Sequence, residues 1–202
     1  MPNHKPSLGE VLQDGDARKR VTEALLSHAK QQGTKVEYTY NTVGGYFDPK
    51  GDQGKPLVAV AKHLEGTDEG LSTLAHELGH AEFEKSPIGR VVRSGTLRSL
   101  AGAAPLIGVV IAHVAEGNAV RRALLSASAV AAMQVPLLAD EGVAWMKGHR
   151  LMKEHGATPQ QLKHLRSEAL RLGSTYLQPG AMGMGTSLLI SALHGAADEG
   201  LI

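Results

Sequence analysis

The hydrophobic and polar positions of the chain divide it into four parts, and the first two predict a helix followed by a small sheet. In the first part, apolar residues recur at helical spacing and predict a helix that breaks near Asp14-Gly15 and ends at Gly33. In the second part, residues 35–40 and 57–61 are rich in β-forming side chains and predict two strands separated by glycine-rich turns. Because the later strand directly precedes a helix, we expect an exposed edge there that can hold an extended peptide by main-chain hydrogen bonds. A small sheet with a purely structural role is the alternative, and the two are compatible.

The next helix has clear start and stop signals. Thr67 is a candidate N-cap, and acidic residues follow it in the first turn, where the helix dipole favours them. Apolar residues then form a stripe at helical spacing, and Ser86-Pro87 ends the helix because proline cannot continue it. The pattern predicts an amphipathic helix with one buried face.

Two apolar runs make up the third part, at residues 99–115 and 123–139. Neither run contains Asp, Glu, Lys or Arg, and each has about 17 residues, the lower limit for a membrane-spanning helix. Their small side chains would permit close helix packing in lipid, so the runs predict a transmembrane helical hairpin. The alternative is a pair of buried helices in a soluble, all-α subdomain. In the fourth part, we expect a helix from Asp140 to about residue 155 and a last helix that ends at Gly173.

Composition narrows the range of functions. The chain has 202 residues, with 21 basic against 20 acidic, and only 3% are aromatic, so we expect no nucleic-acid partner. Cysteine is absent, which excludes disulfides and leaves His, Asp and Glu as ligands for any zinc ion. The polar N-terminal sequence is not that of a secretory signal peptide.

Residues 76–80 read His-Glu-Leu-Gly-His, the H-E-x-x-H pattern of zinc metallopeptidases. On a helix, His76 and His80 lie one turn apart on the same face and can bind one Zn²⁺. Glu77 can then act as the general base that takes a proton from a water molecule on the metal. A surface helix with incidental histidines is the alternative, but the caps, the apolar stripe and Glu77 all favour a zinc site.

Such a site needs a third protein ligand. The astacin-like extension of the motif is excluded, because it would place Gly at position 83 and His at position 86, where this chain has Phe83 and Ser86. Glu141 is the first candidate, since it stands near the start of the helix expected after the apolar hairpin; Asp140 and Glu116 are the other two candidates. His149 and Tyr176 are candidate donors for a developing oxyanion, although either could be an ordinary surface residue.

The order of features in this chain resembles that of the membrane-integrated gluzincin zinc metallopeptidases: a strand, the sequence His-Glu-Leu-Gly-His-Ala, a hydrophobic hairpin and then Glu-x-x-Ala. This group includes the bacterial heat-shock membrane protease and the CAAX prenyl endopeptidase. The resemblance covers roughly residues 35–155 and implies a reduced member, because the long N-terminal membrane segments of the family have no counterpart. Glu141 and Ala144 match the family's Glu-x-x-Ala-Asp motif, but Trp145 replaces its Asp.

Taken together, the sequence predicts an α+β fold, mainly α. A zincin-like small sheet and the HExxH helix would be followed by an apolar helical hairpin, inserted before the helix of the third ligand. We expect residues 1–96 to carry the N-terminal helix, the sheet and the active-site helix, residues 97–139 the hairpin, and residues 140–202 the later helices with a Gly-rich tail.

The predicted function is that of a zinc-dependent endopeptidase acting on a peptide or protein substrate. We expect the hairpin to attach this enzyme to a membrane. Basic residues flank the hairpin on both sides and favour a membrane location with the catalytic part on the cytoplasmic side. These are Arg90, Arg93, Arg98, Lys147, Arg150 and Lys153. Two alternatives remain: a soluble, cytoplasmic HELGH metallopeptidase of the type that cleaves phage repressors, and a non-enzymatic scaffold associated with a membrane or a virion.

Overall fold

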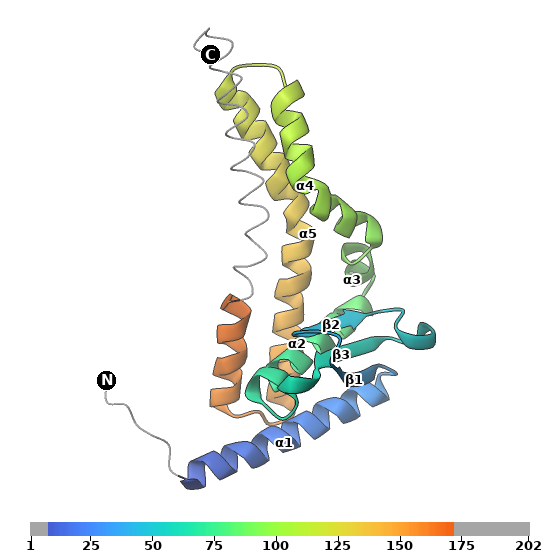
Figure 1. Cartoon of the computed structure of the whole chain (residues 1–202), viewed down its shortest axis with the longest axis vertical. Coiled ribbons are helices and arrows are strands. Elements are labelled where there is room, and N and C mark those ends of the chain that lie inside the picture. Colours follow the sequence, from blue (N-terminus) through green and yellow to red (C-terminus); the bar gives the residue numbers. More distant parts are fainter. Residues whose placement is uncertain (1–7, 172–202) are drawn as a thin grey trace, which may run out of the picture. The chain divides into compact units, whose positions relative to one another are not determined.

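The computed structural model describes residues 8–171, which are mainly helical and include one small mixed sheet (Figure 1). This confirms the α+β, mainly α class. The elements are α1 (Leu8–Gln31), β1 (Lys35–Thr39), β2 (Gly45–Asp48), β3 (Leu57–Ala61), α2 (Asp68–Glu84), α3 (Pro87–Val92), α4 (Gly95–Val114) and α5 (Ala119–Glu154), with a further helix at 159–171 and short 3-10 turns at Asp52–Gly54 and Lys62–Leu64. Two compact units contain these elements, one of residues 8–86 with 142–170 and one of residues 87–141.

The sheet of the first unit has the order β1-β3-β2. β3 pairs in parallel with β1 and antiparallel with β2, and all five of its residues are buried. The expectation that residues 57–61 offer an exposed edge is therefore wrong, because both edges of β3 are occupied. An edge of the sheet is formed by β2 instead, a four-residue strand that begins and ends within segments whose sequence predicts turns.

The core of this unit is a cluster of aliphatic side chains from α1, β3, α2 and the later helices. Its largest fully buried members are Leu25, Leu74, Leu78, Leu151, Met152 and Leu165. Helix α1 runs unbroken through Gly15, so the predicted break there is wrong. The helix ends at Gln31, close to the predicted end at Gly33, and Gly33 has a φ of +71°. The left-handed conformation at Gly33 is one that glycine adopts readily, and it turns the chain toward β1.

Helix α2 begins and ends where the sequence predicts. The Thr67 side chain accepts a hydrogen bond from the Gly70 N–H at 2.9 Å, which satisfies one of the free donors of the first turn. Asp68 and Glu69 follow in that turn, and Pro87 opens the next helix, α3. The cap and the flanking proline thus fix the register in which the HELGH residues appear on α2.

In the second unit, α4 and the first part of α5 pack together through small residues. On α4, Ala101, Ala104, Gly108 and Ala112 are buried along one face. From α5, the Ser126 hydroxyl donates to the Gly108 carbonyl, and the Gln134 amide donates to the Ala101 carbonyl at 3.0 Å. Two polar residues of the second apolar run, Ser126 and Gln134, are therefore used for helix pairing.

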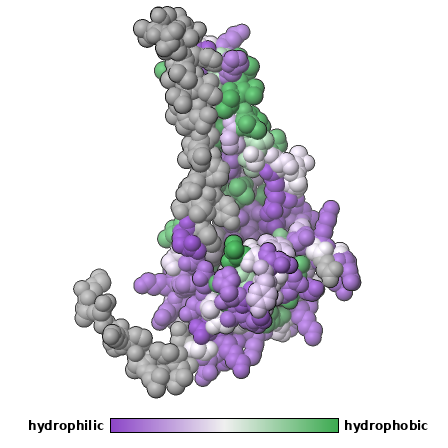
Figure 2. Space-filling model, in the orientation of Figure 1, coloured by the Kyte–Doolittle hydropathy of each residue, from purple (hydrophilic) through white to green (hydrophobic). Residues whose placement is uncertain are grey.

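The outward faces of these two helices are apolar, as the green surface over them in Figure 2 shows. Both helices are long and apolar enough to cross a membrane, and only 22% and 28% of their most apolar segments are buried. Large exposed side chains on them are Leu106, Val110, Val114, Leu124 and Val135.

Helix α5 is one continuous helix of 36 residues. It contains both the second apolar run and the segment that the sequence predicts as a separate helix from Asp140. That predicted boundary is wrong: Asp140 and Glu141 lie in the interior of a helix and not at its N-terminus.

Candidate metal centre

The two histidines of the HELGH motif lie side by side on α2, as their spacing of one turn requires. His76 and His80 are each 5% exposed, and their ring centroids are 4.6 Å apart at an interplanar angle of 72°. A helix holds i and i+4 side chains in this proximity without any long-range contact. Local sequence therefore supplies two of the three ligands that a zinc site needs.

Glu141 of α5 joins the two histidines. One ligand atom from each of His76, His80 and Glu141 can be chosen so that all three lie within 4.8 Å of one another, and Glu141 is 9% exposed. Ligand atoms around a tetrahedral zinc ion lie about 3.4 Å apart, which small side-chain adjustments would reach from this arrangement. Two imidazoles and one carboxylate are also the donor set of known catalytic zinc sites. The group fits a metal ion.

Close contact between two helix backbones places this stretch of α5 against α2. A Cβ atom added at Gly79 would lie 2.0 Å from the Ala144 carbonyl oxygen, and one added at Gly148 would lie 2.6 Å from the Ala75 carbonyl oxygen. Any larger residue at either glycine would force the helices apart. Gly79, the variable position before the second histidine of the motif, thus has a structural role that the motif does not reveal.

Trp145 contributes to the site in a way that sequence reasoning missed. Its indole stacks on the His76 ring, with centroids 4.0 Å apart at an interplanar angle of 27°. Trp145 stands one turn after Glu141 on the same face of α5, so its position relative to the ligand was a usable signal. The indole restricts the orientation of the His76 ring at the position where the resembling family has an aspartate.

Glu77 is also buried, at 6% exposure, and lies next to the edge strand β2. A Cβ atom added at Gly45 would be 3.1 Å from a Glu77 carboxylate oxygen and 2.5 Å from the Thr73 methyl group. Because Gly45 has no side chain, the backbone of β2 can approach the carboxylate. The general-base candidate thus lies beside the edge of the sheet.

The other two third-ligand candidates lie elsewhere. Asp140, which is 1% exposed, accepts hydrogen bonds on its two oxygens from Arg93 Nη1 at 2.9 and 2.8 Å and one from Arg98 Nη2 at 2.9 Å. Glu116 is exposed in the link between α4 and α5. Among the described residues, neither belongs to the group around His76 and His80.

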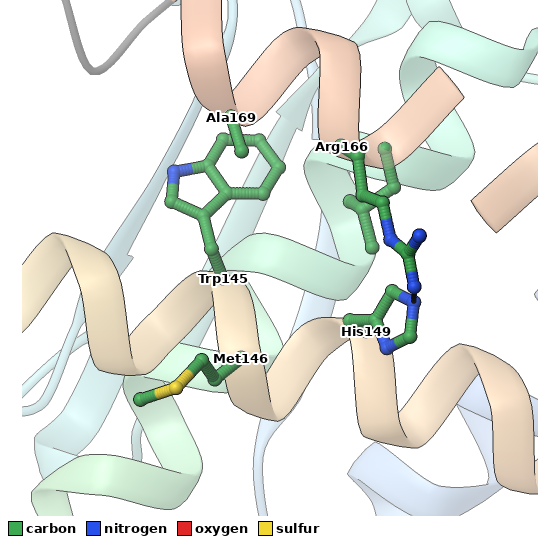
Figure 3. A pocket seen from close by; sticks show the side chains of 6 residues that line it. Trp145, Met146, His149, Arg166 and Ala169 are labelled. Atoms are coloured by element: carbon green, nitrogen blue, oxygen red, sulfur yellow. Dashed lines mark hydrogen bonds between the residues drawn. The ribbon is translucent and has the colours of Figure 1, made fainter. Parts of the chain in front are cut away.

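The structure does not bring His149 into the ligand group, and Tyr176 lies outside the described residues. His149 is two turns beyond Glu141 on α5, where its Nε2 accepts a hydrogen bond from Arg166 Nη2 at 3.2 Å (Figure 3). Burial lowers the pKa of His149, and the positive charges of Arg166 and Lys153 lower it further. A neutral imidazole that accepts from Arg166 is therefore the favoured state of this residue.

Comparison with known proteins adds no family. No family model matches the chain, and no curated protein or solved structure matches it.

Proposed function

We propose that this protein is a zinc-dependent endopeptidase of the gluzincin type, related to the membrane-integrated members that its motifs resemble. The observation that carries the proposal is the convergence of His76, His80 and Glu141, whose ligand atoms come within 4.8 Å of one another beside a buried Glu77. A helix with incidental histidines has no reason to place a distant carboxylate against both imidazoles.

Each residue of the group has a defined role in this proposal. His76, His80 and Glu141 hold the Zn²⁺, which when bound supplies a Lewis acid that polarises the scissile carbonyl and lowers the pKa of a water molecule. Glu77 accepts the proton of that water as it attacks the carbonyl carbon, and then delivers the proton to the leaving amine. Trp145 keeps the His76 ring in place throughout the reaction.

The zincin-like part of the proposal concerns how the substrate is held. An extended peptide can add to the free edge of a sheet by main-chain hydrogen bonds. β2 forms such an edge, and Gly45 brings its backbone next to Glu77. A peptide or protein segment lying along β2 would therefore pass beside the general base, which supports cleavage within a chain.

We also propose that the enzyme is attached to a membrane through α4 and the apolar part of α5, with its catalytic unit on the cytoplasmic side. Large apolar side chains on the outward faces of these helices and the low buried share of both segments favour lipid as their surroundings. The soluble, repressor-cleaving alternative would require these faces to be core.

Two substitutions in the zinc-loaded, full-length protein test the catalytic assignment. Glu77→Gln removes the base and keeps every ligand, so zinc content should stay unchanged while the cleavage rate of a responsive substrate such as unfolded casein falls by about 10²–10⁴-fold. Glu141→Ala removes a ligand, so zinc content and cleavage should fall together. Zinc is measured by elemental analysis after dialysis and cleavage by the release of new amino termini.

The pattern of the two variants separates the alternatives. Cleavage by Glu77→Gln at a near wild-type rate would contradict the assignment of the base. Zinc bound by the wild type with no cleavage of any tested protein would support the non-enzymatic scaffold.

A further inference from the structure

A pocket of about 290 Å³ lies between the C-terminal part of α5 (residues 142–154) and the helix at 159–171, and its lining residues all belong to the unit that carries the HELGH helix. At about 30 Å³ per water molecule, this volume corresponds to roughly ten waters, which suits one large side chain better than a drug-sized ligand. Its lining combines four apolar and two basic side chains: Trp145, Met146, His149, Leu165, Arg166 and Ala169.

The two basic residues meet on one side of the pocket. Figure 3 shows Arg166 extending from helix 159–171 to His149 on α5, whereas Trp145 lies toward Ala169. Arginine is always protonated and can only donate, so His149 Nε2 is the acceptor in their 3.2 Å hydrogen bond. The apolar wall and the guanidinium thus face the same space.

The positive charge of Arg166 has no carboxylate partner within the part of the chain that the structure describes. Arg150, a neighbour in the same unit, pairs with Glu82 at 3.4 Å and with Glu154 at 3.3 Å. Arg166 instead donates to His149, and Lys153 is close enough to His149 for its positive charge to lower the pKa of that imidazole. A guanidinium of this kind favours an incoming anion with the planar geometry of a carboxylate.

Trp145 connects the pocket to the metal centre. Its ring stacks on His76 and also lines the pocket. His149 follows Glu141 by eight residues of one helix, which is about 12 Å along the axis. An extended peptide advances about 3.3 Å per residue, so this distance corresponds to roughly three or four substrate residues.

We propose that this pocket is a specificity subsite for a substrate carboxylate three or four residues from the scissile bond. The aliphatic part of the bound residue packs on Trp145 and Leu165, and its carboxylate binds Arg166. The carboxylate comes from a glutamate or aspartate side chain or from the C-terminus of the substrate. This inference rests on the proposed peptidase function, but the pocket can be tested without catalysis.

Trp145 is the single tryptophan of the chain, so intrinsic fluorescence reports on the pocket directly. The zinc-loaded, full-length Glu77→Gln protein is titrated with three acetylated tripeptides. The first has a central glutamate and an amidated end, the second has glutamine in place of the glutamate, and the third has glutamine with a free C-terminus. We expect the glutamate peptide to bind about tenfold more tightly than its glutamine counterpart, the magnitude of one charge-assisted hydrogen bond. Tighter binding of the third peptide instead would assign the pocket to a chain terminus.

Substitutions on the pocket wall complete the test. Arg166→Gln should remove the difference between charged and neutral peptides, whereas Lys163→Gln, an exposed cation on the same helix outside the pocket lining, should leave it unchanged. Equal affinities in the parent protein, or a preference that survives Arg166→Gln, would overturn the proposal.

Cleavage of a randomised peptide library by the active enzyme then locates the subsite. Acidic residues should be enriched three or four positions from the cut, and Arg166→Gln should lose that enrichment while still cleaving other members. Cleavage without any acidic preference overturns the subsite and leaves the peptidase standing. A carboxylate preference in the fluorescence assay without cleavage of any library member would instead contradict the proposed function.

Discussion

Trp145 stands where the Glu-x-x-Ala-Asp motif that this chain resembles has its aspartate, and its indole stacks on the ring of His76, a candidate metal ligand. A carboxylate at this position would orient a ligand histidine by accepting its N–H, and would fix the tautomer at the same time. The indole of Trp145 restricts the His76 ring through stacking, at a centroid distance of 4.0 Å. An aromatic ring therefore contributes to the orientation of His76 in this chain.

Replacing Trp145 with Ala should weaken zinc binding by about tenfold, the lower end of the effect of losing a group that orients a metal ligand. Trp145→Phe should keep most of the affinity, because a benzene ring can still stack on His76. Zinc affinity is measured by competition with a chromophoric chelator. Equal affinities for the Ala and Phe variants would show that stacking has no part in holding the ligand.

At the residue scale, sequence reasoning performed best where the geometry is local. The spacing of His76 and His80 is enough to predict that they lie together, because one helical turn separates them. The position of Glu141 depends on a long-range helix contact, which a motif can suggest only through chain order. The spacing of Trp145 from Glu141 places the indole on the same face of α5, but its stacking on His76 depends on the contact with α2, which spacing alone does not predict.

At the scale of elements, the contact between α2 and α5 requires glycine on both helices. Gly79 and Gly148 each face a backbone carbonyl of the other helix. Together they let the backbones of α2 and α5 approach more closely than larger side chains would allow. The position of Glu141 depends on this separation, because Glu141 directly precedes the contacting segment of α5.

Gly79→Ala should therefore reduce zinc content even though it changes no ligand. The added methyl group would lie 2.0 Å from the Ala144 carbonyl oxygen, and relief of such a contact costs about 1–3 kcal/mol and shifts the helices. Gly142→Ala is the matched control, since a Cβ atom there has nothing within 4 Å and alanine favours the helix by about 0.5–1 kcal/mol. The zinc content and the midpoint temperature of thermal unfolding should fall in Gly79→Ala only. Equal values for the two variants would contradict the role of this helix contact in placing Glu141.

The Arg93–Asp140 pair is a second element-scale feature, and it joins the link between α3 and α4 to α5. Both side chains are at most 3% exposed, so Asp140→Ala, which removes a carboxylate from a buried guanidinium, should cost about 3–5 kcal/mol. Arg98→Ala should cost at most about 1 kcal/mol, because the Arg98 side chain is 46% exposed. Chemical denaturation of both variants gives the comparison, and a mild effect of Asp140→Ala would mean that the pair is not structural.

Predicted element boundaries failed where tertiary packing overrode a local signal. Gly15 predicts a break, yet α1 continues through it. The acidic pair at 140–141 predicts a helix start, yet α5 begins 21 residues before Asp140. β2 was missed because its four residues begin with Gly45 and end at Asp48-Pro49, both turn signals, and lack a strand pattern of their own. By contrast, the ends of α2 were predictable, since Thr67 and Pro87 act within one turn.

For the whole molecule, the apolar helices predict attachment to a membrane. Because the chain has no cysteine, single introduced cysteines can be labelled selectively to test that prediction. We expect the protein to sediment with membranes and to resist extraction by salt or carbonate, because screening of surface charge does not release an inserted hairpin. Single cysteines then report sidedness. In intact cells, a membrane-impermeant maleimide should label Asn118→Cys in the exposed link, and should label Lys163→Cys only after lysis.

Two results would contradict this arrangement. Monodisperse protein in the soluble fraction without detergent would support the soluble peptidase. Labelling of Lys163→Cys in intact cells would reverse the proposed sidedness while leaving membrane attachment intact.

The continuity of α5 also determines which bonds such an enzyme can reach. Glu141 follows the last residue of the apolar run by two positions, which is about 3 Å along the helix axis. The headgroup layer on each side of a bilayer is about 5–7 Å thick, so a ligand this close to the end of a spanning segment lies at headgroup depth. Scissile bonds would then have to come to the lipid–water boundary. Juxtamembrane segments and peptides adsorbed on the bilayer satisfy that condition, whereas loops held far out in the solvent by a folded domain do not.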